Sequence, residues 1–119
     1  MTRNNDKFAH YKDDMKPTES QIQNAIRTYL EMRGVYVIRV NSGSIPIGTG
    51  KYKRWFKGAD AGTPDLVACH NGKFIGIEVK RPTMKQTDRQ IYQAGRIERA
   101  GGVSIVATSI EDIQKLLQI

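Results

Sequence analysis

The dipeptide Asn71-Gly72 is the feature that most constrains how this chain can fold. It separates two runs rich in apolar and β-branched residues, at positions 65–70 and 73–80. Asn-Gly favours a two-residue turn in which both residues take positive φ, and such a turn joins antiparallel strands. We therefore predict a β-hairpin in which His70 faces Lys73.

The register of this hairpin places two acids opposite each other. Counting outward from the turn pairs Asp65 with Glu78, with their β-carbons roughly 5 Å apart on one face. Lys80 lies two residues beyond Glu78 and projects from the same face. Like charges opposed on a sheet are destabilising, so the pattern indicates a divalent metal held by oxygen ligands.

A solvated hairpin face is the alternative interpretation of these charges. The other residues of that face are mostly apolar: Val67, Cys69, Phe74 and Gly76. The opposite face is apolar too, with Leu66, Ala68, Ile75, Ile77 and Val79. We therefore expect the strand pair to be covered on both sides, with the acids at the margin of a core.

Helix and strand signals surround the hairpin. Polar residues 1–16 predict an N-terminal arm, and residues 17–119 a single domain. Thr18 and Gln21 have capping-box spacing for a helix that Gly34 ends. Between this helix and the hairpin we predict a strand at 35–40 and a Gly-rich loop at 41–62. After the hairpin we predict a helix at 87–100, a strand at 103–107 and a last helix capped by Ser109. The order αβββαβα predicts an α/β fold with a mixed central sheet flanked by helices.

Composition narrows the classes of protein that fit. The 119 residues suit one compact domain, and a net charge of +7 suits a polyanionic partner, although it can also serve solubility alone. The single Cys69 excludes a disulfide framework and a multi-cysteine zinc site, which favours a reducing compartment. No apolar run is long enough to span a membrane, so we expect a soluble, cytoplasmic protein without a membrane partner.

Bases and aromatics alternate within the predicted loop, at Lys51, Tyr52, Lys53, Arg54, Trp55, Phe56 and Lys57. The basic side chains suit contacts to phosphates, and Tyr52 or Trp55 could stack on an unpaired base. The alternative is that Trp55 and Phe56 anchor the loop to the core. Arg81, Lys85 and Arg89 could extend the basic track or simply be solvated.

Glu19 is a third acid of interest. It precedes Ile22 by three residues and so falls on the inward stripe of the first helix. It could face the sheet near the acid pair. It could equally be an ordinary acid that favours the positive end of the helix dipole.

Gly62-Thr-Pro-Asp65 followed by Glu78-Val-Lys80 resembles the motif of the PD-(D/E)XK nuclease superfamily. Together with an early Glu in the first helix and a Gln opening the later helix, the set looks like the VRR-NUC branch over roughly residues 17–108. That branch has stand-alone members in phages and bacteria. The resemblance implies a restriction-endonuclease-like αβββαβ core.

The resemblance also implies the roles of individual residues. Glu19, Asp65, Glu78 and the backbone carbonyl of Val79 match the ligands of Mg²⁺ or Mn²⁺, and Lys80 matches the catalytic lysine. Gln90 matches a glutamine that orients groups at the site. Thr87 and Gln90 also have capping-box spacing, and we do not expect one side chain to fill both roles easily.

The resemblance implies a metal-dependent DNA endonuclease without a nucleotide cofactor. Small stand-alone members resemble Holliday-junction resolvases of DNA repair and recombination, and paired nicks across a branched junction require a homodimer. Cleavage of duplex, flap or single-stranded DNA remains open, as do an RNA substrate and a catalytically inactive DNA-binding module.

Overall fold

The computed structural model describes residues 16–40 and 44–119, so nearly all of the predicted N-terminal arm lies outside it. A mixed four-stranded sheet has the order β1-β4-β5-β6. Its strands are β1 (Tyr36–Arg39), β4 (Leu66–His70), β5 (Lys73–Val79) and β6 (Val103–Ala107). Neighbouring strands are antiparallel except β5 and β6, which are parallel. The predicted α/β fold with a mixed sheet is confirmed.

The β4–β5 hairpin has the predicted register. His70 pairs with Lys73 and Leu66 with Ile77. Asn71 and Gly72 have φ of 52° and 75°, the two positive values that the tight turn needs. Asp65 lies one residue before β4, where its carbonyl accepts a hydrogen bond of 2.9 Å from the Val40 N–H. The strand order and this register together bring Asp65 to the level of Glu78.

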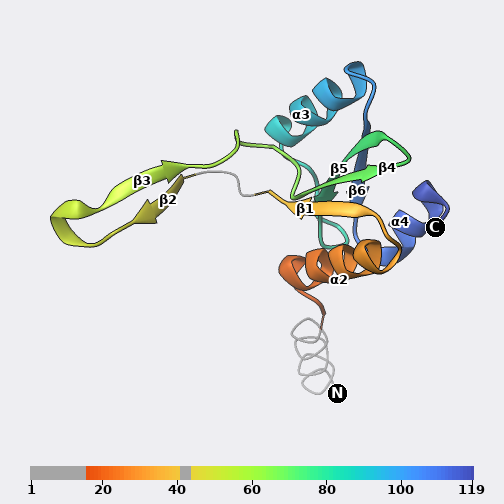
Figure 1. Ribbon diagram of the computed structural model, residues 1–119, viewed down its shortest axis with the longest axis horizontal. Coiled ribbons are helices and arrows are strands. Elements are labelled where there is room, and N and C mark those ends of the chain that lie inside the picture. Colours follow the sequence, from red (N-terminus) through yellow and green to blue (C-terminus); the bar gives the residue numbers. More distant parts are fainter. Residues whose placement is uncertain (1–15, 41–43) are drawn as a thin grey trace, which may run out of the picture.

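Two helices cover one face of the sheet, α2 (Glu19–Met32) and α4 (Ile110–Leu117), as Figure 1 shows. The core lies between these helices and the strands, and its fully buried side chains include Ile26, Leu30, Leu66, Ile77 and Ile113. The predicted capping box of α2 is present, with Thr18 and Gln21 bonding each other's backbone. The hydroxyl of Tyr29 donates to the carbonyl of Ile119 at 2.7 Å and ties α2 to the C-terminus.

The other face of the sheet is covered only in part. Helix α3 (Asp88–Arg99) packs over β5 and β6, and Gly76 allows the approach because a Cβ there would lie 2.7 Å from Ile97. Beyond this contact Phe74 is 48% exposed and Cys69 is exposed. The expectation that both faces are covered was therefore wrong for the part of the sheet that α3 does not reach.

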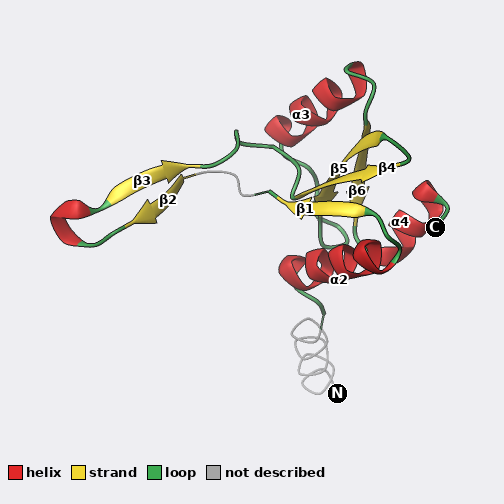
Figure 2. Ribbon diagram, viewed as in Figure 1, coloured by secondary structure: helices red, strands yellow, loops and turns green. Residues whose placement is uncertain are grey.

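The predicted loop at 41–62 contains a second hairpin, formed by β2 (Ser44–Ile47) and β3 (Arg54–Lys57) and closed by the short 3₁₀ helix η1 (Gly50–Tyr52). The strands pair Pro46 with Trp55 and Ile47 with Arg54. In Figure 2 this hairpin extends away from the sheet. The strands escaped prediction because Pro46 and the glycines interrupt the pattern, which a two-stranded ribbon with free edges tolerates.

The last helix begins after Ser109 as predicted, but the Ser109 side chain makes no capping bond. The carboxylate of Asp112, in the first turn of the helix, instead accepts two hydrogen bonds from Thr108, one from its N–H at 2.8 Å and one from its hydroxyl at 3.0 Å.

Within residues 16–40 and 44–119, no helix has the length and apolar character needed to cross a bilayer.

Candidate active site

The carboxyls of Asp65 and Glu78 meet at one end of the central strands β4 and β5, under the start of α3. The side chain of Glu78 on β5 is only 4% exposed. Asp65 is held beside it because its Oδ2 accepts a hydrogen bond of 2.8 Å from the N–H of Val79. That bond was not foreseen, although the predicted register already placed the two residues opposite each other. A buried acid, Glu78, and a half-buried acid, Asp65, therefore lie side by side.

Burial is the main reason that the pKa of Glu78 rises from 4.5 to about 8. The negative charge of Asp65 and a hydrogen bond between the two carboxyls raise this pKa further, and the charge of Glu19 adds to the effect. The positive charge of Lys80 acts in the opposite direction but does not cancel it. A site that holds two ionised carboxylates here needs another cation.

Gln90 is the residue of α3 that reaches this pair. Its Nε2 donates to Oε1 of Glu78 at 2.9 Å, while its Oε1 accepts from the N–H of Thr87 at 2.8 Å. The hydroxyl of Thr87 in turn accepts from the N–H of Gln90 at 3.2 Å. The expectation that one side chain could not fill both roles was wrong, because an amide can use its oxygen for the cap and its nitrogen for the carboxylate.

Lys80 follows the last residue of β5, and its side chain is 8% exposed. Its N–H donates to the carbonyl of Ala107 at 3.0 Å, which fixes the backbone to β6. A buried ammonium close enough to affect the pKa of Glu78 can orient a water molecule or stabilise an oxyanion. The structure therefore brings together Asp65, Glu78, Lys80 and Gln90.

Glu19 lies in the first turn of α2, half-buried, and its charge reaches Glu78. In the described part of the chain, however, no three His, Cys, Asp or Glu side chains are close enough to form a metal site by themselves. The role of Glu19 as a metal ligand therefore stays a prediction. The N–H of Val79 bonds Asp65, and the role of its carbonyl as a ligand stays a prediction.

Gly62 lets the segment before Asp65 pass directly under α3. Its φ is +85°, and a Cβ there would lie 2.5 Å from the backbone carbonyl of Arg89 and 2.9 Å from the nitrogen of Gln90. The glycine therefore sets the spacing between Asp65 and the helix that carries Gln90. In the sequence, Gly62 stood out only as part of a motif.

Gly62→Ala is expected to destabilise the fold by roughly 2–4 kcal/mol, because the new methyl must displace backbone and also adopt a left-handed conformation. Gly34→Ala is the matched control, since Gly34 has φ of +74° and a methyl group there would have nothing within 4 Å. That variant should lose only about 1 kcal/mol. Urea unfolding of both variants measures the difference, and equal losses would contradict the packing role of Gly62.

The basic and aromatic residues of the predicted loop lie on the β2–β3 hairpin, away from the acid pair (Figure 1). Trp55 is 65% exposed, with the ammonium of Lys53 5.0 Å from its ring centre. Lys51 lies 5.3 Å from the ring centre of Tyr52, which is also exposed. Trp55 does not anchor the segment to the core, so that alternative was wrong for Trp55. The side chains of Phe56 and Lys57 lie outside what the structure describes.

The other predicted basic positions follow β5. Arg81 is half-buried and lines a pocket beside α2. Lys85 and Arg89 are exposed, and Arg54 on the hairpin is exposed as well. None of these side chains belongs to the cluster around Glu78.

Comparisons with known proteins bear on the fold. No protein-family model matches the sequence, and no curated protein matches it. Among solved structures, a chain described as a VRR_NUC domain superposes with a TM-score of 0.59 at 20% sequence identity, covering 84% of this chain and 94% of that one. The chain has the fold of a VRR-NUC domain. The resemblance seen in the sequence motifs thus extends to the three-dimensional arrangement of the VRR-NUC fold.

The VRR-NUC fold explains why distant segments share one site. Antiparallel pairing of β4 and β5 brings Asp65 beside Glu78, and the crossover from β5 through α3 to β6 returns Gln90 to the same place. Two contributors went unnoticed in the sequence, the N–H of Val79 and the packing of Gly62. Only the strand register could have indicated the first, because a backbone donor leaves no mark in residue types.

Proposed function

We propose that this chain is a metal-dependent nuclease that hydrolyses phosphodiester bonds in DNA. The observation that carries the proposal is the buried Glu78 carboxyl, which lies against Asp65, accepts from Gln90 and is close to Lys80. Ionising such a buried carboxyl costs free energy unless a cation is present, and groups of this kind are concentrated at functional sites and not in purely structural cores.

The donor set fits Mg²⁺ or Mn²⁺. Gln90 and Val79 each occupy one carboxylate oxygen, so Glu78 and Asp65 each keep a second oxygen for a cation. Two carboxylates suffice for Mg²⁺, which usually keeps several waters, and the Val79 carbonyl and Glu19 would assist. When bound, the ion supplies charge that polarises a phosphate and lowers the pKa of water.

The chain's own residues then orient the reaction. The Val79 N–H fixes the direction of the Asp65 carboxylate, and the Gln90 amide fixes that of Glu78. Lys80, buried and anchored through its backbone to β6, positions the attacking water or stabilises the negative charge that develops on the phosphate. Because the cap of α3 holds Gln90, the carboxylate needs little reorganisation before reaction.

We propose branched DNA as the preferred substrate. The β2–β3 hairpin presents Lys51, Lys53 and Arg54 to phosphates, and exposed Tyr52 and Trp55 can stack where bases are unpaired. The described residues of one chain form one such acid pair, so symmetric nicks across a four-way junction need a homodimer. Elution at monomer size at working concentrations, or a junction cut no better than a duplex, would remove this part of the proposal.

The decisive experiment compares labelled four-way junction, flap, single-stranded and duplex DNA, with single-stranded RNA as a further substrate, in Mg²⁺, Mn²⁺ and EDTA. We expect cutting of DNA in both metals, none in EDTA, and the highest rate on the junction. Binding without cutting in every metal would leave a DNA-binding module with the same fold. Preferential cutting of another substrate would keep the nuclease and replace the junction.

The single tryptophan of the chain makes the hairpin's role measurable. Trp55→Ala should weaken DNA binding by roughly tenfold, because stacking on one base contributes about 1–3 kcal/mol. Trp55 fluorescence in the wild type should be quenched on DNA addition. The control is Tyr36→Ala, which removes an aromatic on β1 that is likewise exposed, at 69%. Equal affinities for both variants would exclude the hairpin from the DNA interface.

A further inference from the structure

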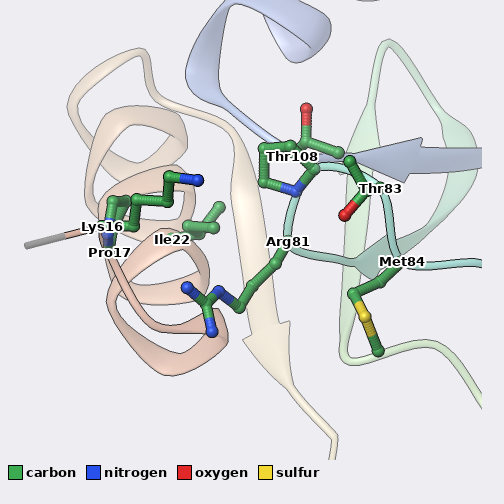
Figure 3. A pocket seen from close by; sticks show the side chains of 8 residues that line it. Lys16, Pro17, Ile22, Arg81, Thr83, Met84 and Thr108 are labelled. Carbon is green, nitrogen blue, oxygen red and sulfur yellow. The ribbon is translucent and has the colours of Figure 1, made fainter. Parts of the chain in front are cut away.

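A pocket of about 620 Å³ lies between the start of α2 and the turn that follows β5. Lys16 borders it from the α2 side, and Arg81 and Thr83 border it from the turn. Figure 3 shows the side chains of Lys16 and Arg81 extending toward each other past Ile22. The described residues that line the pocket include two basic side chains, Lys16 and Arg81, and no acidic one.

The rest of the wall is apolar. Ile22 of α2 and Met84 of the turn contribute side chains, and prolines flank them. The hydroxyl of Thr108, at the rim, already donates to Asp112. A pocket with two cations on one part of its wall and apolar side chains on another suits an anion that carries an apolar body. A bare inorganic ion would leave the apolar part unused.

The turn at this wall is strained. The N–H of Met84 donates to the carbonyl of Arg81 at 3.1 Å, with Pro82 and Thr83 as the central residues. Thr83 has φ of 76°, at a turn position that glycine normally occupies, and a β-branched residue there is a true outlier. Strained residues of this kind are concentrated where their side chains are needed for binding.

We propose that this pocket binds a nucleotide of the substrate strand adjacent to the bond that is cut. Its phosphate lies between Lys16 and Arg81, its sugar and base lie against Ile22 and Met84, and Thr83 contributes a hydroxyl. This inference rests on the proposed nuclease function. The location supports it, since Arg81 of the pocket wall directly follows Lys80 of the acid cluster in the chain.

Binding can be measured without cleavage by titrating a short labelled single-stranded oligonucleotide in EDTA. Lys16→Gln and Arg81→Gln should each weaken binding roughly tenfold and reduce the slope of log affinity against log salt by about 0.7. Lys115→Gln, on the exposed side of α4, is the matched control for loss of one charge and should leave both quantities nearly unchanged. Pocket variants that bind like the control would overturn the proposal.

Thr83→Gly separates binding from folding. The variant should melt no lower than the wild type, since relief of the positive φ offsets the greater freedom of glycine in the unfolded chain. Its affinity for the oligonucleotide should nevertheless fall several-fold, because the hydroxyl is lost. An unchanged affinity would show that Thr83 serves only the turn and would remove it from the site.

The nature of the ligand can be resolved by following backbone amide signals of residues 81–84 during titration with a deoxynucleoside monophosphate or inorganic phosphate. We expect the deoxynucleoside monophosphate to shift these signals at a clearly lower concentration than inorganic phosphate does. If both ligands shift the signals at the same concentration, the pocket binds anions without preference for a nucleotide, and the nucleotide assignment is overturned. If the wild type cuts no DNA but the pocket variants lose oligonucleotide binding, the nuclease function is overturned and the pocket proposal is retained. If the pocket variants bind and cut DNA like the wild type, the nuclease function is retained and the pocket proposal is overturned.

Discussion

Replacing Glu78 with glutamine is expected to abolish cleavage while stabilising the metal-free fold. Glutamine keeps the shape of the side chain, and its oxygen can still accept from Gln90. The loss of one charged ligand should reduce the cleavage rate by at least about a thousandfold, because metal stabilisation of the transition state contributes several kcal/mol. Loss of activity without loss of folding would mark Glu78 as a functional group.

The stabilising effect follows from the sign of the pKa shift. An unfolded chain releases the Glu78 proton near pH 4.5, whereas the folded chain releases it near pH 8. Between these values the folded state binds more protons, so its free energy of unfolding falls as pH rises, by at most about 1.4 kcal/mol per pH unit. Above pH 8 the loss is complete, and below pH 4.5 it is absent.

Thermal unfolding in EDTA between pH 5 and pH 9 measures this effect. The wild type should lose stability across the range, and Glu78→Gln should lose much less, so that the variant is the more stable protein at the alkaline end. Saturating Mg²⁺ should remove most of the wild-type decline, because a bound cation favours the ionised carboxylate. Glu98→Gln, an exposed acid on α3, is the control and should follow the wild type in both stability and cleavage. A wild-type profile that is flat in EDTA would contradict the buried-acid account.

Lys80→Met is expected to lower the rate of cleavage by roughly a hundred- to ten-thousandfold, with little change in KM. Methionine fills a similar volume at this buried position but carries no charge to orient water or stabilise the reacting phosphate. The same change should raise the pKa of Glu78 further, because the charge of Lys80 holds that pKa down. The pH dependence of stability in EDTA should therefore extend to higher pH.

Two further variants make the Lys80 prediction specific. Lys73→Met removes an exposed lysine at the other end of β5 and should keep nearly full activity. Lys80→Arg keeps the charge but not the shape, and we expect it to recover only a small part of the rate, since a planar guanidinium does not replace a compact ammonium. Full activity in Lys80→Met would exclude the lysine from the chemistry.

Much of the site could be predicted from the sequence, because it depends on short-range rules. Asn71-Gly72 determines a tight turn, the turn determines the register, and the register places Asp65 beside Glu78. Capping boxes at Thr18 and Thr87 likewise identified where two helices begin. Each of these features involves residues only a few positions apart or separated by a single turn.

Other features depended on contacts between segments distant in sequence. Whether Gln90 reaches Glu78, how far Glu19 stands from the pair and how closely Gly62 passes α3 are set by the way helices pack on the sheet. The exposed face beyond α3 was missed for the same reason, since exposure depends on which elements cover a strand. The β2–β3 hairpin was missed because Pro46 and the glycines interrupt its sequence pattern.

The sequence by itself thus determined the mixed α/β fold, the hairpin register and the identity of the paired acids and lysine, because strand alternation and turn geometry are local. Only the tertiary structure decided that Glu78 is buried, that one glutamine both caps α3 and binds that carboxyl, and that Lys16 and Arg81 share a pocket. Burial and distance are properties of packing between elements, and no short stretch of residues encodes them.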